Sequence, residues 1–231
     1  MTFAAVRVLA CIPLAALSLG ATSSGRAANC QSLTADTAFS YKFENRRFYI
    51  PLIQVNIDAG GNGQLHFMRG ESDDVIERKF KILPSTVERI VRLLGVTGFL
   101  DSKEEYQAKK DFSHLGWMTI TVRQGERERT VRFNYTTNQD IGALAELFNG
   151  IATQEIDLFD LELAVQHQPL DVPRMLDALE TDLRLERIAE PEQLVARLRE
   201  LGGDDTMPLI GRNHANRIIK DIEKGKYKQR K

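Results

Sequence analysis

The feature that most constrains the fold is a change in hydrophobic periodicity near the middle of the chain. Residues 53–57, 118–124 and 129–135 alternate apolar and polar side chains, a two-residue period that predicts half-buried strands. No comparable alternation follows residue 150, where the apolar residues recur at helical spacing. The sequence therefore predicts an α+β fold, in which an antiparallel sheet built from hairpins is packed by two helices and is followed by an all-helical C-terminal segment.

Two hairpins account for most of the expected strands. The first spans residues 48–69 around a Gly-Gly-Asn-Gly turn, and the second joins the two alternating stretches within residues 118–135. Pro51 cannot donate a hydrogen bond to a ladder, so the first strand either lies at a sheet edge there or begins after Pro51. A further short strand is expected at residues 75–82. The small, polar residues 29–38 are expected to form a leader.

Helix signals occur on both sides of the change in period. Ser85 and Glu88 have the spacing of a capping box. In this motif the serine hydroxyl accepts from the backbone N–H of the glutamate, and the glutamate carboxylate accepts from the backbone N–H of the serine. Asn138 is expected to cap a second helix, which carries apolar residues through Ile151. The helices expected after that are residues 155–168, 171–188, 191–201 and a last one that begins at Pro208.

The N-terminal segment predicts export. Residues 1–28 contain a short basic region, an apolar run from Val8 to Ala21 and small residues suited to peptidase cleavage. The apolar run is shorter than the roughly 20 residues that span a bilayer, so we expect contact with a membrane only before cleavage. Cys11 would leave with this segment, and Cys30 alone cannot form an internal disulfide. We expect a periplasmic or secreted protein that is stable without disulfides.

Charge is distributed unevenly over the exported part. Residues 29–153 form the expected α+β domain, with 16 basic and 16 acidic residues, and residues 154–231 form the helical segment. Within that segment, residues 154–211 carry 14 acidic and 5 basic residues, whereas residues 212–231 carry 8 basic and 2 acidic ones. The basic tail is either a solvated terminus, a cover for the acidic helices or a contact for an anionic partner. Nucleic-acid binding is not expected, because the sheet domain is neutral and the protein is exported.

The densest group of reactive side chains is Asp111, Ser113 and His114, in an expected loop before a strand. An exported hydrolase would use His114 as a base, with a second acid such as Asp101 or Asp58 within hydrogen-bond reach. Residues so close in sequence rarely form a catalytic triad, and they also suit a turn whose polar side chains bond the local backbone. The loop is thus either a catalytic site or an ordinary turn.

Four basic residues are candidates for binding an anion. Arg123 and Arg132 point outward from the second hairpin beside threonines, where they would hold an acidic glycan or a phosphate or simply face water. Arg212 and His214 lie on the last helix and would bind an anion or a carboxylate, or else cap the helix and form surface salt bridges. The four histidines have no spacing typical of metal ligands. We therefore expect neither a metal nor a cofactor.

The layout of the first domain resembles that of uncharacterised exported bacterial domains of unknown function. The similarity covers residues of about 40–150 and rests on four motifs that match in order, and it implies an exported α+β domain without a known activity. These motifs are a D-x-G-x-G-like turn at 58–63 with one extra residue, a G-F-L-D-S segment at 98–102, Asp111 before a strand, and an R-x-V-x-F strand at 129–133.

These observations favour a non-catalytic binding or interaction domain of the cell envelope. Its partner is expected to be an envelope protein or an anionic polymer, bound by the sheet face, the helical segment or the basic tail. The exported hydrolase that uses Asp111, Ser113 and His114 is the alternative.

Overall fold

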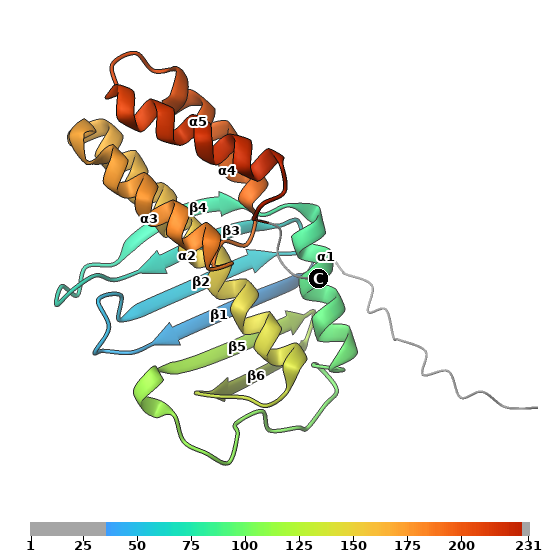
Figure 1. The fold of residues 1–231 in the computed structure, drawn as a ribbon. Helices are drawn as coiled ribbons and strands as arrows, with labels where there is room; N and C mark the ends of the chain where they lie inside the picture. Colours follow the sequence, from blue (N-terminus) through green and yellow to red (C-terminus); the bar gives the residue numbers. More distant parts are fainter. Residues whose placement is uncertain (1–35, 228–231) are drawn as a thin grey trace, which may run out of the picture.

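The computed structural model describes residues 36–227, so the expected signal segment lies outside the described residues. Within this range the chain forms a six-stranded antiparallel sheet and five α-helices (Figure 1). The predicted α+β class is confirmed, as is the helical character of the C-terminal part. The strands follow the spatial order β4-β3-β2-β1-β5-β6, and their bounds are β1 (Thr37–Glu44), β2 (Leu52–Asp58), β3 (Asn62–Phe67), β4 (Ile76–Lys81), β5 (Trp117–Gln124) and β6 (Arg127–Phe133).

The central strand β1 is absent from the sequence prediction, which has a leader through residue 38 and no strand before residue 48. β1 does alternate, with Phe39 and Tyr41 buried and Ser40 between them facing the other way. It pairs with β2 on one side and β5 on the other, and so joins the two predicted hairpins into one sheet. β2 begins directly after Pro51, which confirms the second of the two alternatives for that proline.

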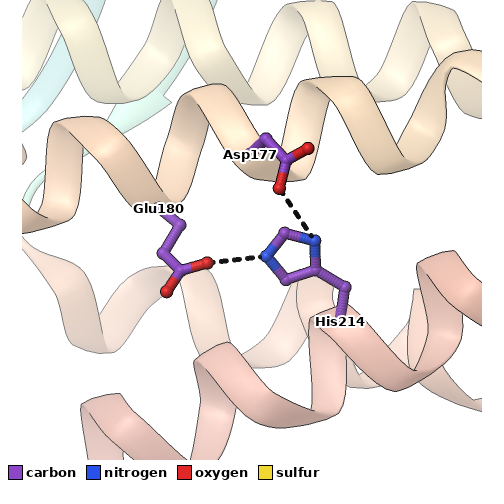
Figure 2. Close-up of side chains that lie close together, drawn as sticks. All are labelled: Asp177, Glu180 and His214. Atoms are coloured by element: carbon purple, nitrogen blue, oxygen red, sulfur yellow. Dashed lines mark hydrogen bonds and ion pairs between the residues drawn. The ribbon is translucent and has the colours of Figure 1, made fainter.

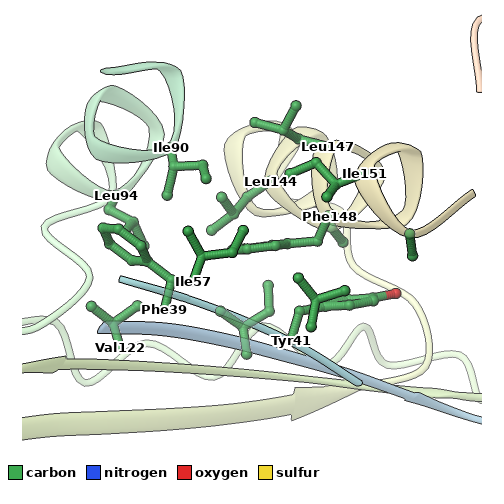
Figure 3. Close-up of a cluster of buried hydrophobic side chains, with 14 of the residues drawn as sticks. Phe39, Tyr41, Ile57, Ile90, Leu94, Val122, Leu144, Leu147, Phe148 and Ile151 are labelled. Carbon is green, nitrogen blue, oxygen red and sulfur yellow. The ribbon is translucent and has the colours of Figure 1, made fainter. Parts of the chain in front are cut away.

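Two helices cover one face of the sheet. α1 (Pro84–Val96) and the first half of α2 (Gln139–His167) bury the apolar side chains of the inner strands (Figure 3). Near the centre of this core the ring of Tyr41 stacks on that of Phe148, with 5.5 Å between centroids, while the Tyr41 hydroxyl donates to Asn149 Oδ1 at 2.9 Å. The sheet core is thus an apolar layer in which the Tyr41 hydroxyl has a hydrogen-bond partner.

The predicted capping box at Ser85 is wrong, because α1 begins at Pro84 and Ser85 lies exposed inside its first turn. The free N–H of Leu83 donates instead to Glu190 Oε1 at 2.8 Å, from the helical segment. Glu190 is itself buried, and its own N–H donates to Gln154 Oε1 at 2.9 Å. A side chain 107 residues away in sequence therefore caps the helix that the local motif was expected to cap.

α2 is one continuous helix of 29 residues where the sequence predicted two. Asn138 caps it as predicted, because its Oδ1 accepts from the N–H groups of Asp140 and Ile141 at 3.1 Å. Its apolar residues through Ile156 belong to the sheet core, and those from Leu161 onward belong to a second core. The helices that form this second core with α2 are α3 (Val172–Arg184), α4 (Pro191–Gly203) and α5 (Leu209–Glu223).

An ion pair fixes α2 to the sheet edge. Arg78 on β4 lies on the helix-covered face, where it donates to Glu155 Oε2 at 2.8 Å and to both oxygens of Glu162 at 2.7 and 3.1 Å. Burial raises the pKa of Glu155 even though Arg78 opposes that shift.

In the part of the chain that the structure describes, no helix combines the length and the apolarity that crossing a bilayer would take.

Candidate binding face

The face of the sheet opposite α1 and α2 is polar. Strand alternation that turns Phe39 and Ile57 toward the helices turns their neighbours outward. The strand register places Ser40 opposite Asn56 on one side and opposite Thr121 on the other. Continuing outward, Asn56 pairs with Gln64 and Thr121 pairs with Thr130. An uncharged row of amides and hydroxyls thus crosses five strands, and Lys79 on β4 extends it beside Gln64.

A hollow of about 730 Å³ lies along this row. The small side chains Ala38 and Ser40, in the first half of β1, line this hollow. Longer side chains stand on both sides of them, including Lys79 on β4 and Arg123 on β5. We call this hollow the sheet groove; its outward-facing lining residues are Ala38, Ser40, Asn56, Asp58, Asn62, Gln64, Lys79, Thr121, Arg123 and Glu128.

Some polar groups of the sheet groove are already engaged. Ser40 donates to Asn56 Oδ1 at 2.8 Å, and the hydroxyls of Thr121 and Thr130 lie 2.8 Å apart. Asp58 serves the β2–β3 turn, where its carboxylate accepts from Asn62 Nδ2 and from two backbone N–H groups. Those bonds, led by the one from Asn62, lower the pKa of Asp58 and hold it as a turn carboxylate.

Other groups in the groove have no side-chain partner among residues 36–227. These groups are the Gln64 amide, the Lys79 ammonium, the Arg123 guanidinium and the Glu128 carboxylate. Since neighbouring strands lie roughly 4.8 Å apart, the cations on β4 and β5 stand about 19 Å from each other across the sheet. The groove therefore offers two separated cations on either side of neutral donors and acceptors, with the Glu128 carboxylate opposite Arg123 in the β5–β6 register.

The two predicted arginines of this face have different surroundings. Arg123 lines the groove. Arg132 lies on the same face toward the other end of the strands, where its guanidinium stacks over the ring of Trp117 at 4.5 Å from the centroid. Arg123 is thus the one that remains available to a ligand in the groove.

The structure uses Asp111 and Ser113 within their own loop. Asp111 accepts from the Ser113 N–H at 2.8 Å and from its hydroxyl at 3.2 Å. Buried Asn134 donates to the same carboxylate at 2.6 Å and accepts from the Phe112 N–H at 3.1 Å. The bond from the Ser113 backbone is the chief reason that the pKa of Asp111 is lowered. These contacts are those of a hydrogen-bonded turn before β5.

His114 lacks the geometry of a general base. Its side chain is exposed, and its ring lies 6.1 Å from that of Phe112. The two acids considered as its partners are elsewhere: Asp101 pairs with Arg127, and Asp58 lies in the β2–β3 turn. Among the described residues, Asp111 is the one carboxylate found to interact with the imidazole of His114. Within residues 36–227, neither Asp101 nor Asp58 is therefore placed to act with His114, and Asp111 is bonded within its own turn.

His214 lies buried between α3 and α5, facing two carboxylates (Figure 2). Its Nε2 is 2.8 Å from Glu180 Oε2, and its Nδ1 is 3.5 Å from Asp177 Oδ1. Arg217 also donates to Glu180 Oε2 at 2.8 Å. Burial tends to raise the pKa of Glu180, but the bonds from His214 and Arg217 outweigh it and lower the pKa. The carboxylate that His214 was expected to bind is thus one of the protein's own.

The group of Asp177, Glu180 and His214 has the residue types of a metal site, with one ligand atom from each within 4.8 Å of the others. Its arrangement suits a metal poorly, because the imidazole ring stands between the two carboxylates with a nitrogen toward each (Figure 2). Arg217 would also bring a positive charge to the same oxygen of Glu180. Arg212, the other predicted residue of this helix, pairs with Asp205. The cluster therefore fastens α5 to α3.

Sequence reasoning missed the groove residues on β1 and β3. Asn56 was recognised as outward-facing, but its row became visible only with β1 between the two hairpins. Ala38 and Ser40 carry no chemical signal of their own, since they matter by being small. A search for strands among the small and polar residues after position 36 would have found them.

No protein-family model matches this chain, and no curated protein is significantly similar to it.

Proposed function

We propose that this chain is an exported, non-catalytic binding protein of the cell envelope, and that the sheet groove holds an extended anionic polysaccharide. The observation that carries the proposal is the neutral amide and hydroxyl row between two cations, Lys79 and Arg123, which have no side-chain partner within residues 36–227. Export rests on the signal segment read from residues 1–28.

The chemistry of the groove favours a sugar polymer. Amides and hydroxyls both donate and accept, which suits the hydroxyl groups of a polysaccharide. Arg and Lys form charge-assisted hydrogen bonds with carboxylates and sulfates. Acidic groups about 19 Å apart along one polysaccharide chain would therefore reach both Arg123 and Lys79. A short ligand would reach only one of these cations.

Binding fits the groove better than catalysis does. Of its two carboxylates, Asp58 is committed to the β2–β3 turn, and Glu128 has no side-chain partner among the described residues to tune or orient it. Acid–base catalysis on a sugar bond would need two carboxyl groups positioned for opposite roles.

The test is affinity electrophoresis of the mature chain in gels that contain alginate as an anionic polysaccharide or dextran as a neutral one. We expect retardation by alginate, and a retardation at least about tenfold weaker for Lys79→Ala/Arg123→Ala. Ser40→Trp, which fills the centre of the groove, should abolish binding while both cations remain. Lys220→Ala/Lys224→Ala on and after α5 is the charge-matched control and should bind normally.

Equal retardation of the wild type and of Ser40→Trp would contradict the proposal, because attraction to the general charge of the protein would then explain the binding. Retardation by neither polysaccharide, with the protein folded, would contradict the assignment of the ligand class.

A further inference from the structure

One corner of the helix-covered face of the sheet has no helix over it. α2 crosses the sheet obliquely, and the ends of β1 and β5 beside the short helix at Ser113–Leu115 lie outside its path (Figure 1). Phe43 and Ile53 are paired there on the same face as Tyr41, yet they are only partly buried. A hollow of about 640 Å³ opens at this corner, which we call the apolar corner; its lining is Phe43, Phe48, Tyr49, Ile50, Ile53, Leu115 and Asn149.

The exposed side chains of the apolar corner are large. Phe48 is 46% exposed, Tyr49 is 72% exposed and Leu115 is 48% exposed. Single exposed apolar residues are ordinary, but a contiguous aromatic patch around a hollow is typical of an interaction surface. Aromatic anchors in such patches commonly dominate the binding free energy.

The loop that carries these aromatics is held in place before any partner arrives. The Asn45 N–H donates to Pro51 O at 2.9 Å, and the Phe48 N–H donates to Asn45 O at 3.0 Å. Buried Asn45 also donates from Nδ2 to His114 O at 3.1 Å, which ties the loop to the one before β5. A preorganised loop loses little conformational entropy when it binds.

Two adjacent loops at this end of the sheet carry opposite charges that do not pair with any residue that the structure describes. Arg46 and Arg47 are exposed beside Phe48, and neither side chain has a partner among the described residues. The next loop is joined to this one by the Gly70 N–H, which donates to Tyr49 O at 2.7 Å. That loop exposes Glu71 and Asp73, also without side-chain partners in the described part, and an apolar Val75 that is 50% exposed.

We infer that the apolar corner binds a second copy of this chain across a two-fold axis. A two-fold interface brings one surface against itself, so each feature must be met by its complement from the same surface. Here the arginines of one copy would face Glu71 and Asp73 of the other, while Val75 would enter the partner's apolar corner. Charge complementarity of this kind selects the partner and its register.

Once residues 1–28 are removed as the expected signal segment, the other segments of the chain outside the described residues suit the corner less well. Residues 228–231 are Lys-Gln-Arg-Lys and would be repelled by Arg46 and Arg47. Residues 29–35 contain a single large apolar side chain, Leu33. A second copy supplies both the acidic and the apolar groups.

The test is sedimentation equilibrium of the mature chain and of two charge-reversed variants, Arg46→Glu/Arg47→Glu and Glu71→Arg/Asp73→Arg. We expect the wild type to dimerise and each variant alone to dissociate at least about tenfold more readily. An equimolar mixture of the two variants should recover dimerisation, because the arginine-free copy and the acid-free copy complement each other at both contacts. The matched control, Lys220→Glu/Lys224→Glu, should dimerise like the wild type.

A monomeric wild type at the highest soluble concentration would overturn the inference. So would variants that dimerise as the wild type does, or a mixture that stays monomeric while circular dichroism shows both variants folded. Because all four charged residues are exposed and unpartnered, their reversal should leave the thermal unfolding of the monomer nearly unchanged. The groove lies on the opposite face, so polysaccharide binding and dimerisation succeed or fail independently.

Discussion

The sheet core and the helical core of this protein are stabilised in different ways. The sheet core buries aromatic rings under α1 and α2, among them Tyr41, Phe67 and Phe148. The helical core buries leucines and isoleucines, but it also takes in the carboxyl groups of Glu180 and Asp157. Two further acids, Glu155 and Glu190, are buried where the helical segment meets β4 and the start of α1. Buried charge makes stability depend on pH and on each partner being present, whereas buried rings do not. The two halves should therefore respond differently to mutation and to pH.

The largest effect is expected in the sheet core. Phe148→Ala removes a fully buried ring that stacks on Tyr41, and should lower the free energy of unfolding by about 3–5 kcal/mol. Urea unfolding followed by circular dichroism measures it, with exposed Leu185→Ala as the control. A loss below about 1 kcal/mol would show that the sheet core repacks around the gap.

Removal of a buried carboxylate should come second. Glu180→Ala leaves His214 and Arg217 without their shared acceptor, which we expect to cost about 2–4 kcal/mol. Asp177→Ala removes only the exposed partner of His214 and should cost under about 1 kcal/mol. Amide hydrogen exchange in Glu180→Ala should become faster in α5 and stay unchanged in β1. An equal loss of protection in both elements would mean that the two cores do not unfold separately.

Replacing Asp157 should raise the free energy of unfolding, whereas the substitutions above lower it. Burial, aided by the charges of Asp182 and Asp160, raises its pKa to about 8, and its Oδ2 is buried without a hydrogen-bond partner among the described residues. The unfolded carboxyl ionises near pH 4, so the folded state loses stability as pH rises from there toward 8. Asp157→Asn should add about 1–2 kcal/mol at pH 7 and nothing below about pH 4. Thermal melts at both pH values test this, and a pH-independent gain would refute the titration.

The smallest effects test the joint between the two cores. Ser85→Ala should change the free energy of unfolding by less than about 0.5 kcal/mol, because Ser85 caps nothing. Glu190→Ala should cost about 1–2 kcal/mol, because it removes the acceptor of the Leu83 N–H. A larger loss of stability for Ser85→Ala than for Glu190→Ala would show that the helix is capped by Ser85 after all.

What the sequence could predict depended on how locally each feature is determined. The hairpin around residues 58–63, the cap at Asn138 and the outward positions of Arg123 and Arg132 follow from neighbours in sequence. The bond from Leu83 before α1 to Glu190 and the bond from Arg78 on β4 to Glu155 on α2 join distant segments, and no spacing rule contains them. β1 alternates as the predicted strands do, but it begins at Thr37, inside the small, polar stretch that was expected to be a leader, and the groove was missed with it.

The continuity of α2 has a consequence for how the two cores are joined. At about 1.5 Å per residue, its 29 residues form a helix roughly 43 Å long. Its first half packs in the sheet core and its second half packs in the helical core. Because one helix supplies apolar side chains to both cores, the two cores share a continuous backbone ladder and are joined by more than a loop. Arg78 bonds this helix to β4 through Glu155 near its midpoint and Glu162 in its second half.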